Sequence, residues 1–205
     1  MTQLFFEYGA MGSGKTIEIL KVAYNYEEQN KEVLLFTPIV ADRDGKGIVA
    51  SRIGLSKEAI AVSNNLDLFE YVEKELDKLG NKLAAVLVDE AQFLSAIQVD
   101  QLAKIVDELN IPVMAFGLKQ DAFNELFEGS KRLLEVADKL VEMKTICVFC
   151  GKKATANMRV IDGKPVYSGQ QVYIGGNESY IPTCRYHYYH PDLEKLKDIF
   201  IENKK

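Results

Sequence analysis

An eight-residue loop near the amino terminus constrains this chain more than any other feature. Residues 9–16 read G-A-M-G-S-G-K-T and satisfy the phosphate-loop pattern G-x-x-x-x-G-K-[ST] at every fixed position. An apolar run from Leu4 to Tyr8 before the loop predicts a buried strand, and residues 16–28 place apolar side chains at helical spacing. Strand, glycine loop and helix is the order that a phosphate site requires, because loop N–H groups and a helix N-terminus then face phosphate oxygens.

Each residue of the loop has an expected role. Lys15 would reach the β- and γ-phosphates, and the Thr16 hydroxyl would ligate Mg²⁺. The backbone that would surround the phosphate oxygens belongs to Gly9, Ala10, Met11, Gly12, Ser13 and Gly14. A chance glycine-rich turn is the alternative, and the matching strand and helix on either side of the loop speak against it.

Predicted strands and helices alternate along the first two thirds of the chain. The predicted strands are residues 4–8, 32–37, 84–88 and 111–116, and the predicted helices are 16–28, 66–79, 99–109 and 130–137. Residues 39–56 carry three glycines and several charges, which predicts a long loop. Continuously apolar strands are typical of a parallel sheet covered on both faces, so we predict an α/β fold with helices flanking that sheet.

The composition and pattern of the sequence change near Lys144. From Thr145 onward there are turn signals, short strand-like pieces at 155–161 and 172–174, and all of the cysteines and histidines. A helix is predicted at 191–203. We therefore predict a nucleotide-binding α/β domain at 1–144, a small metal-binding domain at 145–190 and a terminal helix or tail at 191–205.

The composition argues against several classes of protein. A length of 205 residues with 47% hydrophobic residues suits one domain with a small appendage. The net charge of −5 argues against a nucleic-acid binder, and no apolar stretch approaches the roughly 18 residues of a membrane span. Three cysteines are too few for a disulfide framework, and no signal peptide is evident, so we expect a cytoplasmic protein.

A hydrophobic strand that ends in two carboxylates predicts the second half of the nucleotide site. Residues 84–88 are apolar, and Asp89 and Glu90 follow them. In phosphate-loop enzymes an aspartate at this place holds the Mg²⁺ shell, usually through water. Glu90 would then be available to orient or deprotonate an attacking hydroxyl. The plainer alternative is a surface acidic pair at a strand end.

Four soft donors near the carboxyl end predict a metal site. Cys147 and Cys150 form C-x-x-C, and Cys184 and His187 form C-x-x-H. Two such pairs suit a tetrahedral, structural Zn²⁺, because a site with four protein ligands has no open position for water. We expect residues 145–190 to lack the bulk for a core of their own and to depend on the metal for folding. A redox C-x-x-C is the weaker alternative.

Together these motifs resemble the type II thymidine kinases, the cytosolic family found in many bacteria and in vertebrate cells. The glycine loop, the segment D-E-A-Q-F at 89–93, the paired metal ligands, and I-G-G at 174–176 followed by Tyr180 are each similar to motifs of that family. The resemblance runs across nearly the whole chain. It implies a RecA-like phosphate-loop domain followed by a zinc ribbon whose lasso loop encloses thymine.

The resemblance also implies a reaction, the ATP-dependent phosphorylation of the thymidine 5′-hydroxyl to give thymidine monophosphate. Glu90 would be the general base, and Gln92 would join Asp89 and the glycine loop at the nucleotide. The implied thymidine-binding residues are Met11, Asp42, Arg43, Phe93, Leu118, Phe127, Arg159, Ile174, Gly175 and Tyr180. The family relation further implies a homotetramer.

The sugar side departs from the family pattern. The family usually carries D-x-R after its second strand, whereas the corresponding residues here are Ala41-Asp42-Arg43. Either Asp42 takes the aspartate's place through a local shift, or the sugar is contacted differently.

Two other functions fit parts of the sequence. Residues 89–92 spell a DEAQ box of the helicase type, although the chain is short for paired motor domains and a zinc ribbon follows. Nucleic-acid-stimulated ATP hydrolysis would favour this alternative. The other is a non-catalytic zinc-dependent binding module, against which the intact set of Lys15, Thr16, Asp89 and Glu90 speaks.

Overall fold

A computed structural model describes residues 2–41, 47–169 and 178–202 of the chain. The chain divides into two compact units. Unit 1 contains Met1–Tyr8, Gly14–Leu118 and Phe127–Glu142, and unit 2 contains Gly9–Ser13, Lys119–Leu126 and Met143–Lys205. Because unit 2 takes segments from both sides of residue 144, the division into domains at 1–144, 145–190 and 191–205 stays a prediction.

Six parallel strands form the central sheet of unit 1, in the order β5-β2-β6-β7-β1-β8. The strands are β1 (Leu4–Tyr8), β2 (Glu32–Pro38), β5 (Ile60–Val62), β6 (Leu83–Val88), β7 (Val113–Gly117) and β8 (Lys139–Glu142). The predicted parallel α/β sheet is therefore confirmed. Since β1, β7 and β6 are parallel neighbours, their carboxyl ends lie at the same edge of the sheet, which is where such folds bind ligands.

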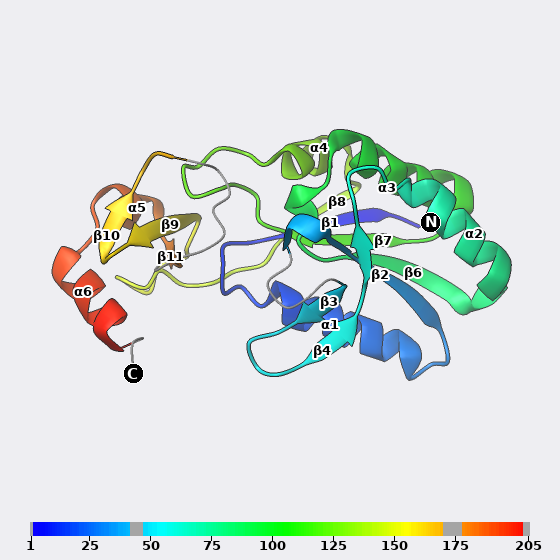
Figure 1. Cartoon of the computed structure of the whole chain (residues 1–205), viewed down its shortest axis with the longest axis horizontal. Helices are drawn as coiled ribbons and strands as arrows, with labels where there is room; N and C mark the ends of the chain where they lie inside the picture. Colours follow the sequence, from blue (N-terminus) through cyan, green and yellow to red (C-terminus); the bar gives the residue numbers. More distant parts are fainter. Residues whose placement is uncertain (1, 42–46, 170–177, 203–205) are drawn as a thin grey trace. The chain divides into compact units, whose positions relative to one another are not determined.

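Helices cover both faces of this sheet. They are α1 (Lys15–Glu27), α2 (Leu68–Leu79), α3 (Ala96–Leu109) and α4 (Glu128–Val136). Figure 1 shows α2, α3 and α4 along one face and α1 on the other. Within the described part of the chain, no helix is long and apolar enough to cross a lipid bilayer.

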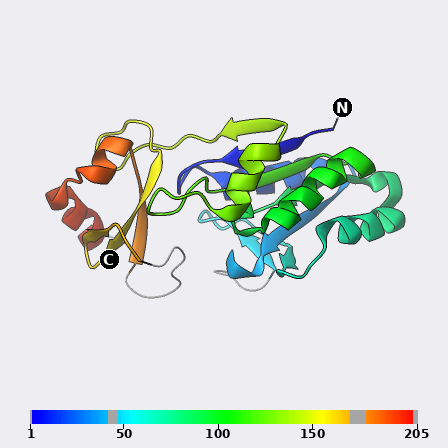
Figure 2. The same ribbon diagram turned by 90° about the horizontal axis from the view of Figure 1, so that it is seen from above.

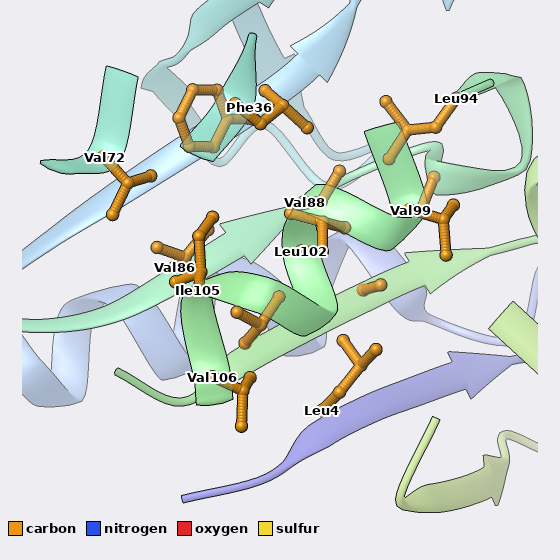
Figure 3. Packing of buried hydrophobic residues seen from close by; sticks show 14 of the residues in the cluster. Leu4, Phe36, Val72, Val86, Val88, Leu94, Val99, Leu102, Ile105 and Val106 are labelled. Carbon is orange, nitrogen blue, oxygen red and sulfur yellow. The ribbon is translucent and has the colours of Figure 1, made fainter. Parts of the chain in front are cut away.

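The core of unit 1 lies between the sheet and the helices α2, α3 and α4. Figure 3 shows Val99, Leu102 and Ile105 of α3 pointing toward Val86 and Val88 of the sheet. All five side chains are buried, and each contributes roughly 1.5–3 kcal/mol by leaving water. This packing holds the carboxyl end of β6 in place, immediately before Asp89.

Side-chain caps set where two of these helices begin. Ser95 and Gln98 form a reciprocal capping box at the start of α3, and the Asp67 side chain accepts a hydrogen bond from the Glu70 N–H at 2.9 Å to start α2. As a result α3 begins at Ala96, three residues before the predicted start at Val99. Likewise α2 begins at Leu68 rather than at Leu66.

The structure differs from the sequence prediction mainly in its short strands. The predicted loop at 39–56 contains a 3₁₀ turn (Ile39–Ala41) and the strand β3 (Ile48–Ala50), which pairs with β4 (Ser56–Glu58) in an antiparallel hairpin. Strands of three residues are too short to show a periodic pattern, so β3, β4 and β5 left no signal. The predicted strand at 172–174 lies outside the described residues.

Unit 2 contains a three-stranded antiparallel sheet in the order β10-β9-β11. Its strands are β9 (Ala156–Ile161), β10 (Lys164–Val166) and β11 (Glu178–Thr183), and its helices are α5 (Arg185–Tyr189) and α6 (Leu193–Glu202). Asp162 and Gly163 both have positive φ, at 49° and 72°, as an Asp-Gly hairpin turn between β9 and β10 requires. Figure 2 shows α5 and α6, coloured orange to red, beside this sheet.

A small hydrophobic core holds unit 2 together. Its buried residues are Cys147, Phe149, Ala156, Met158, Val160, Ile181, Tyr188 and Leu196. The expectation that residues 145–190 lack a core of their own was therefore too strong. Part of this core comes from Leu196 of α6, and the Tyr188 hydroxyl ties the segment Lys119–Leu126 to the unit by donating a 2.6 Å hydrogen bond to the Ala122 carbonyl.

Candidate functional site

The first part of the glycine loop, Gly9–Ser13, is held by unit 2. The Met11 N–H donates to Asn157 Oδ1 on β9 at 2.8 Å, and the Ser13 N–H donates to the Ala10 carbonyl at 3.3 Å. A side chain at Gly9 would place its Cβ 2.3 Å from the Met143 carbonyl oxygen, so only glycine fits there. Asn157 is buried, and buried polar groups need hydrogen-bond partners. The sequence prediction did not include Asn157, although an asparagine inside the predicted strand 155–161 was an available signal.

The second part of the loop starts helix α1 in unit 1. Gly14 occupies the N-cap position with φ +83°, a left-handed conformation that favours glycine, and its carbonyl accepts from the Glu18 N–H at 3.0 Å. Lys15 and Thr16 are the first two residues of α1. This end of a helix has a partial positive charge, which favours an anionic ligand.

Asp89 follows β6 directly and is only 6% exposed. Its N–H donates to the Phe36 carbonyl of β2 at 2.9 Å, which fixes its position at the end of the sheet. Burial raises the pKa of Asp89 to about 7, and the neighbouring Glu90 charge adds to this effect, while the Lys15 cation acts against it. A bound cation at this carboxylate would offset the clustered negative charge.

The Lys15 ammonium lies in the same electrostatic environment. Burial lowers the pKa of Lys15, and the charges of Glu90 and Asp89 act in the opposite direction. The structure therefore brings together in unit 1 three of the charged residues that the sequence assigned to phosphate and metal chemistry.

Glu90 has an unusual backbone conformation. Its φ of 50° and ψ of 38° are left-handed, and it caps the short 3₁₀ helix η3 (Ala91–Phe93). A non-glycine residue in this region costs of order 1–3 kcal/mol, and such strain concentrates at functional sites. Its carboxylate accepts a 2.5 Å hydrogen bond from Gln92 Nε2, and the Glu90 N–H donates to Asp89 Oδ1 at 3.0 Å.

Three of the predicted thymidine-binding residues lie close together in unit 1. The rings of Phe93 and Phe127 meet edge to face with centroids 5.5 Å apart. The Leu118 N–H donates to Gln92 Oε1 at 3.0 Å, which links the end of β7 to η3. This group therefore joins apolar side chains to the segment that carries Glu90.

The other predicted thymidine-binding residues fall in unit 2 or outside the described chain. Arg159 and Tyr180 are directly opposite each other in the pairing of β9 with β11, and Arg159 is buried. Met11 belongs to the loop segment held by Asn157. Asp42, Arg43, Ile174 and Gly175 lie outside the described residues.

Cys147, Cys150, Cys184 and His187 form a compact cluster in unit 2. Their ligand atoms all lie within 4.8 Å of one another. Cys150 Sγ is 3.8 Å from Cys184 Sγ, and His187 Nδ1 is 3.8 Å from Cys147 Sγ and 3.4 Å from Cys184 Sγ. Ligands bound at roughly 2.0–2.3 Å in a tetrahedron would be separated by roughly 3.5–3.8 Å, so the four donors fit one metal ion.

Two local structures shape this cluster. The carbonyl of Cys147 accepts from the Gly151 N–H at 2.9 Å, and Gly151 has a φ of 70°, so the first cysteine pair lies on a tight turn. Cys184 caps α5, which places His187 one helical turn later on the same side. The four predicted ligands therefore lie together, in an arrangement that could hold a metal ion.

Comparisons with known proteins found similarity along nearly the whole chain. A family model described as thymidine kinase matches residues 2–188. A protein of Lactobacillus johnsonii named thymidine kinase is 59% identical over 199 residues, which cover 95% of this chain and all of that protein. A Streptococcus pyogenes serotype M1 protein of the same name is 58% identical over 193 residues, covering 94% of this chain and all of the relative.

Proposed function

The chain belongs to the thymidine kinase family, and we propose that it transfers the γ-phosphoryl group of ATP to the 5′-hydroxyl of thymidine. The observation that carries this proposal is the grouping of Lys15, Asp89 and Glu90 in unit 1, after strands of a parallel sheet that end at one edge. A cation, a metal-binding carboxylate and a base are the groups that phosphoryl transfer to an alcohol requires.

We assign the phosphates of ATP to the glycine loop and Lys15. The Lys15 ammonium would neutralise charge on the β- and γ-phosphates as the transition state forms. Thr16 and Asp89 would hold Mg²⁺, which, when bound, neutralises charge on the transferring phosphate. Asp89 suits this role because its burial makes an unbalanced negative charge costly.

Glu90 is the proposed general base. Its carboxylate would accept the proton of the thymidine 5′-hydroxyl as that oxygen bonds to the γ-phosphorus. The bond between the γ-phosphorus and the β,γ-bridging oxygen breaks at the same time, so the products are thymidine monophosphate and ADP. Such a base contributes typically 10²–10⁴-fold to the rate.

The residues proposed to contact thymidine are described for each unit separately. Phe93, Leu118 and Phe127 supply apolar and aromatic surface in unit 1, and the Phe93–Phe127 contact supports their acting as a group. In unit 2 the family resemblance assigns Met11, Arg159 and Tyr180 to thymidine. The roles of Asp42, Arg43, Ile174 and Gly175 rest on the resemblance alone.

We further propose that the metal in unit 2 is a structural Zn²⁺. Three sulfur atoms and one imidazole nitrogen are the donors that Zn²⁺ prefers, and four protein ligands leave no position for a reactive water. The resemblance also supports a cytoplasmic enzyme that assembles as a homotetramer, which sedimentation would test.

The test is the rate of ADP formation with a panel of acceptors. We expect thymidine to stimulate ADP formation strongly, and deoxycytidine and deoxyadenosine to give little, because a wrong base leaves polar groups unpaired. Single-stranded DNA is added in a separate assay, because the motor alternative predicts that it stimulates ATP hydrolysis. Stimulation by DNA without stimulation by thymidine would favour the motor alternative and contradict the proposal.

A further inference from the structure

We propose that Gln92 is a positioning residue that holds the Glu90 carboxylate and the end of β7 in one fixed arrangement. This inference rests on the proposed function, in which Glu90 is the general base. The family resemblance assigned Gln92 to the nucleotide, whereas both ends of its carboxamide are engaged inside unit 1. Its effect on the reaction would therefore act through Glu90.

The Gln92 side chain is enclosed on all sides and has little freedom. It is only 2% exposed. A side chain at Gly117 would place its Cβ 2.7 Å from Gln92 Oε1 and 3.0 Å from the backbone nitrogen of Gln92. The chain at Gly117 therefore approaches Gln92 too closely for any residue but glycine. A buried amide in such a space must find its hydrogen bonds in a single orientation.

The partners of Gln92 decide that orientation. The Leu118 N–H can only donate, so the atom facing it at 3.0 Å must be the amide oxygen. The amide NH₂ group then faces Glu90 Oε2 at 2.5 Å, and an ionised carboxylate can only accept. A flipped amide would set donor against donor and acceptor against acceptor. The Leu118 N–H thus aims the Gln92 donor at the proposed base.

Leu118 is itself held from its other side. The hydroxyl of the buried Ser130 donates to the Leu118 carbonyl at 2.5 Å. Ser130 follows Gly129 on α4, where a Cβ would lie 2.5 Å from the Ala91 carbonyl oxygen of η3. A continuous set of contacts therefore runs from α4 through Leu118 and Gln92 to Glu90, and it fixes the base relative to a predicted wall of the thymidine site.

This arrangement also accounts for how Glu90 keeps its strained backbone. A left-handed glutamate persists only where the surrounding structure holds it. Gln92 follows two residues later in η3 and provides a direct hydrogen bond to the same side chain. Losing that bond would leave the carboxylate free to adopt orientations that do not reach the hydroxyl proton.

The test combines Gln92→Met with a mutant cycle. Methionine has a similar shape but lacks both the amide donor and the amide oxygen. We expect Gln92→Met to lower kcat about 10–100-fold, by analogy with the loss of groups that orient metal ligands. The thymidine Kd should change by less than about twofold, since neither of the two lost hydrogen bonds is made to thymidine. In a Glu90→Gln background the same change should cost little more, because both act through one carboxylate.

Gln98→Met is the matched control. Gln98 is equally buried, at 4% exposure, but its amide donates to the Ser63 and Leu66 carbonyls. This control should lose stability and keep kcat.

If Gln92→Met does not fold, Gln92→Asn is the second variant. Asparagine keeps the amide but is too short to span both partners, so the same loss of kcat is expected.

Two outcomes separate the inference from the proposed function. Losses of kcat that add fully in the Glu90→Gln background, or a Gln92 variant with unchanged kcat, would overturn the positioning role while leaving thymidine phosphorylation intact. A parent protein that phosphorylates no nucleoside would overturn the proposed function, and the role of Gln92 with it.

Discussion

At the residue scale, two adjacent carboxylates at the end of β6 have different surroundings. Asp89 is buried, and its pKa is raised to about 7 by burial and by the Glu90 charge. Glu90 projects from a left-handed backbone and is bonded by the Gln92 amide. Different environments allow neighbouring carboxylates to take different roles, so that one can bind a cation and the other can accept a proton.

From this contrast we predict the effect of Glu90→Gln. Glutamine keeps the size of the side chain but cannot accept the hydroxyl proton, so kcat should fall roughly 10²–10⁴-fold. Binding of ATP and thymidine, measured by calorimetry, should be nearly unchanged. Turnover within a few-fold of the parent would mean that another group takes the proton.

At the element scale, β1 carries an ionisable group that reports on the packing of α1. Glu7 of β1 is half-buried, and burial raises the pKa of its carboxyl above 4.5, with a further contribution from Glu18 on α1 and an opposing one from Lys21. Because the pKa is raised in the folded state, the protonated form favours folding. That contribution is present below pH 4.5 and is lost as the pH rises through the folded pKa.

We therefore predict that Glu7→Gln raises the Tm at pH 7 by about 1–3 °C and changes it little at pH 4. Thermal unfolding at the two pH values measures the difference. Glu73→Gln is the control, because Glu73 is an exposed residue of α2 and its loss removes the same charge. An equal shift in both variants would show that net charge, and not the burial of Glu7, is responsible.

The elements that could be predicted from the sequence are those with a strong local signal. The run Leu83–Val88 is continuously apolar and buried, and so its place in a covered parallel sheet was evident. The Ser95–Gln98 capping box was also readable and would have moved the start of α3 to Ala96. The exposed edge strand β8, by contrast, depends on pairing with β1, which no local pattern reveals.

The same distinction applies to the site. Lys15, Asp89 and Glu90 belong to motifs whose chemistry requires them to meet, and unit 1 does bring them together. The contact of Gln92 with the Leu118 N–H joins residues 26 positions apart in the sequence. It arises from the order of β6 and β7 in the sheet, which the spacing of residues does not encode.

At the scale of the whole molecule, the four predicted metal ligands belong to unit 2 and adjoin its core. Cys147 is both a predicted ligand and a buried core residue beside Phe149 and Met158. The Lys195 ammonium of α6 donates to the Phe149 carbonyl at 2.9 Å, so the terminal helix is tied to the same turn. Loss of the proposed metal should therefore loosen α6 as well as the cysteine turns.

We predict one Zn²⁺ per chain by elemental analysis of unchelated protein, and its loss in Cys147→Ser. Hydrogen exchange in residues 145–169 and 178–196 of that variant should accelerate at least about tenfold, because metal binding supplies folding free energy. Exchange in β6 and β7 should change far less. His190→Ala, which removes an exposed histidine outside the cluster, should keep its zinc; a metal-free parent would refute the assignment.

The most direct test of thymidine kinase activity follows the labelled γ-phosphate of ATP into product. With the parent protein, Mg²⁺ and thymidine, we predict that the label appears in thymidine 5′-monophosphate, identified by mass spectrometry. With 5′-deoxythymidine, which lacks the acceptor hydroxyl, no labelled nucleotide should form. Label released only as inorganic phosphate, at a rate that thymidine does not change, would contradict the proposed phosphoryl transfer.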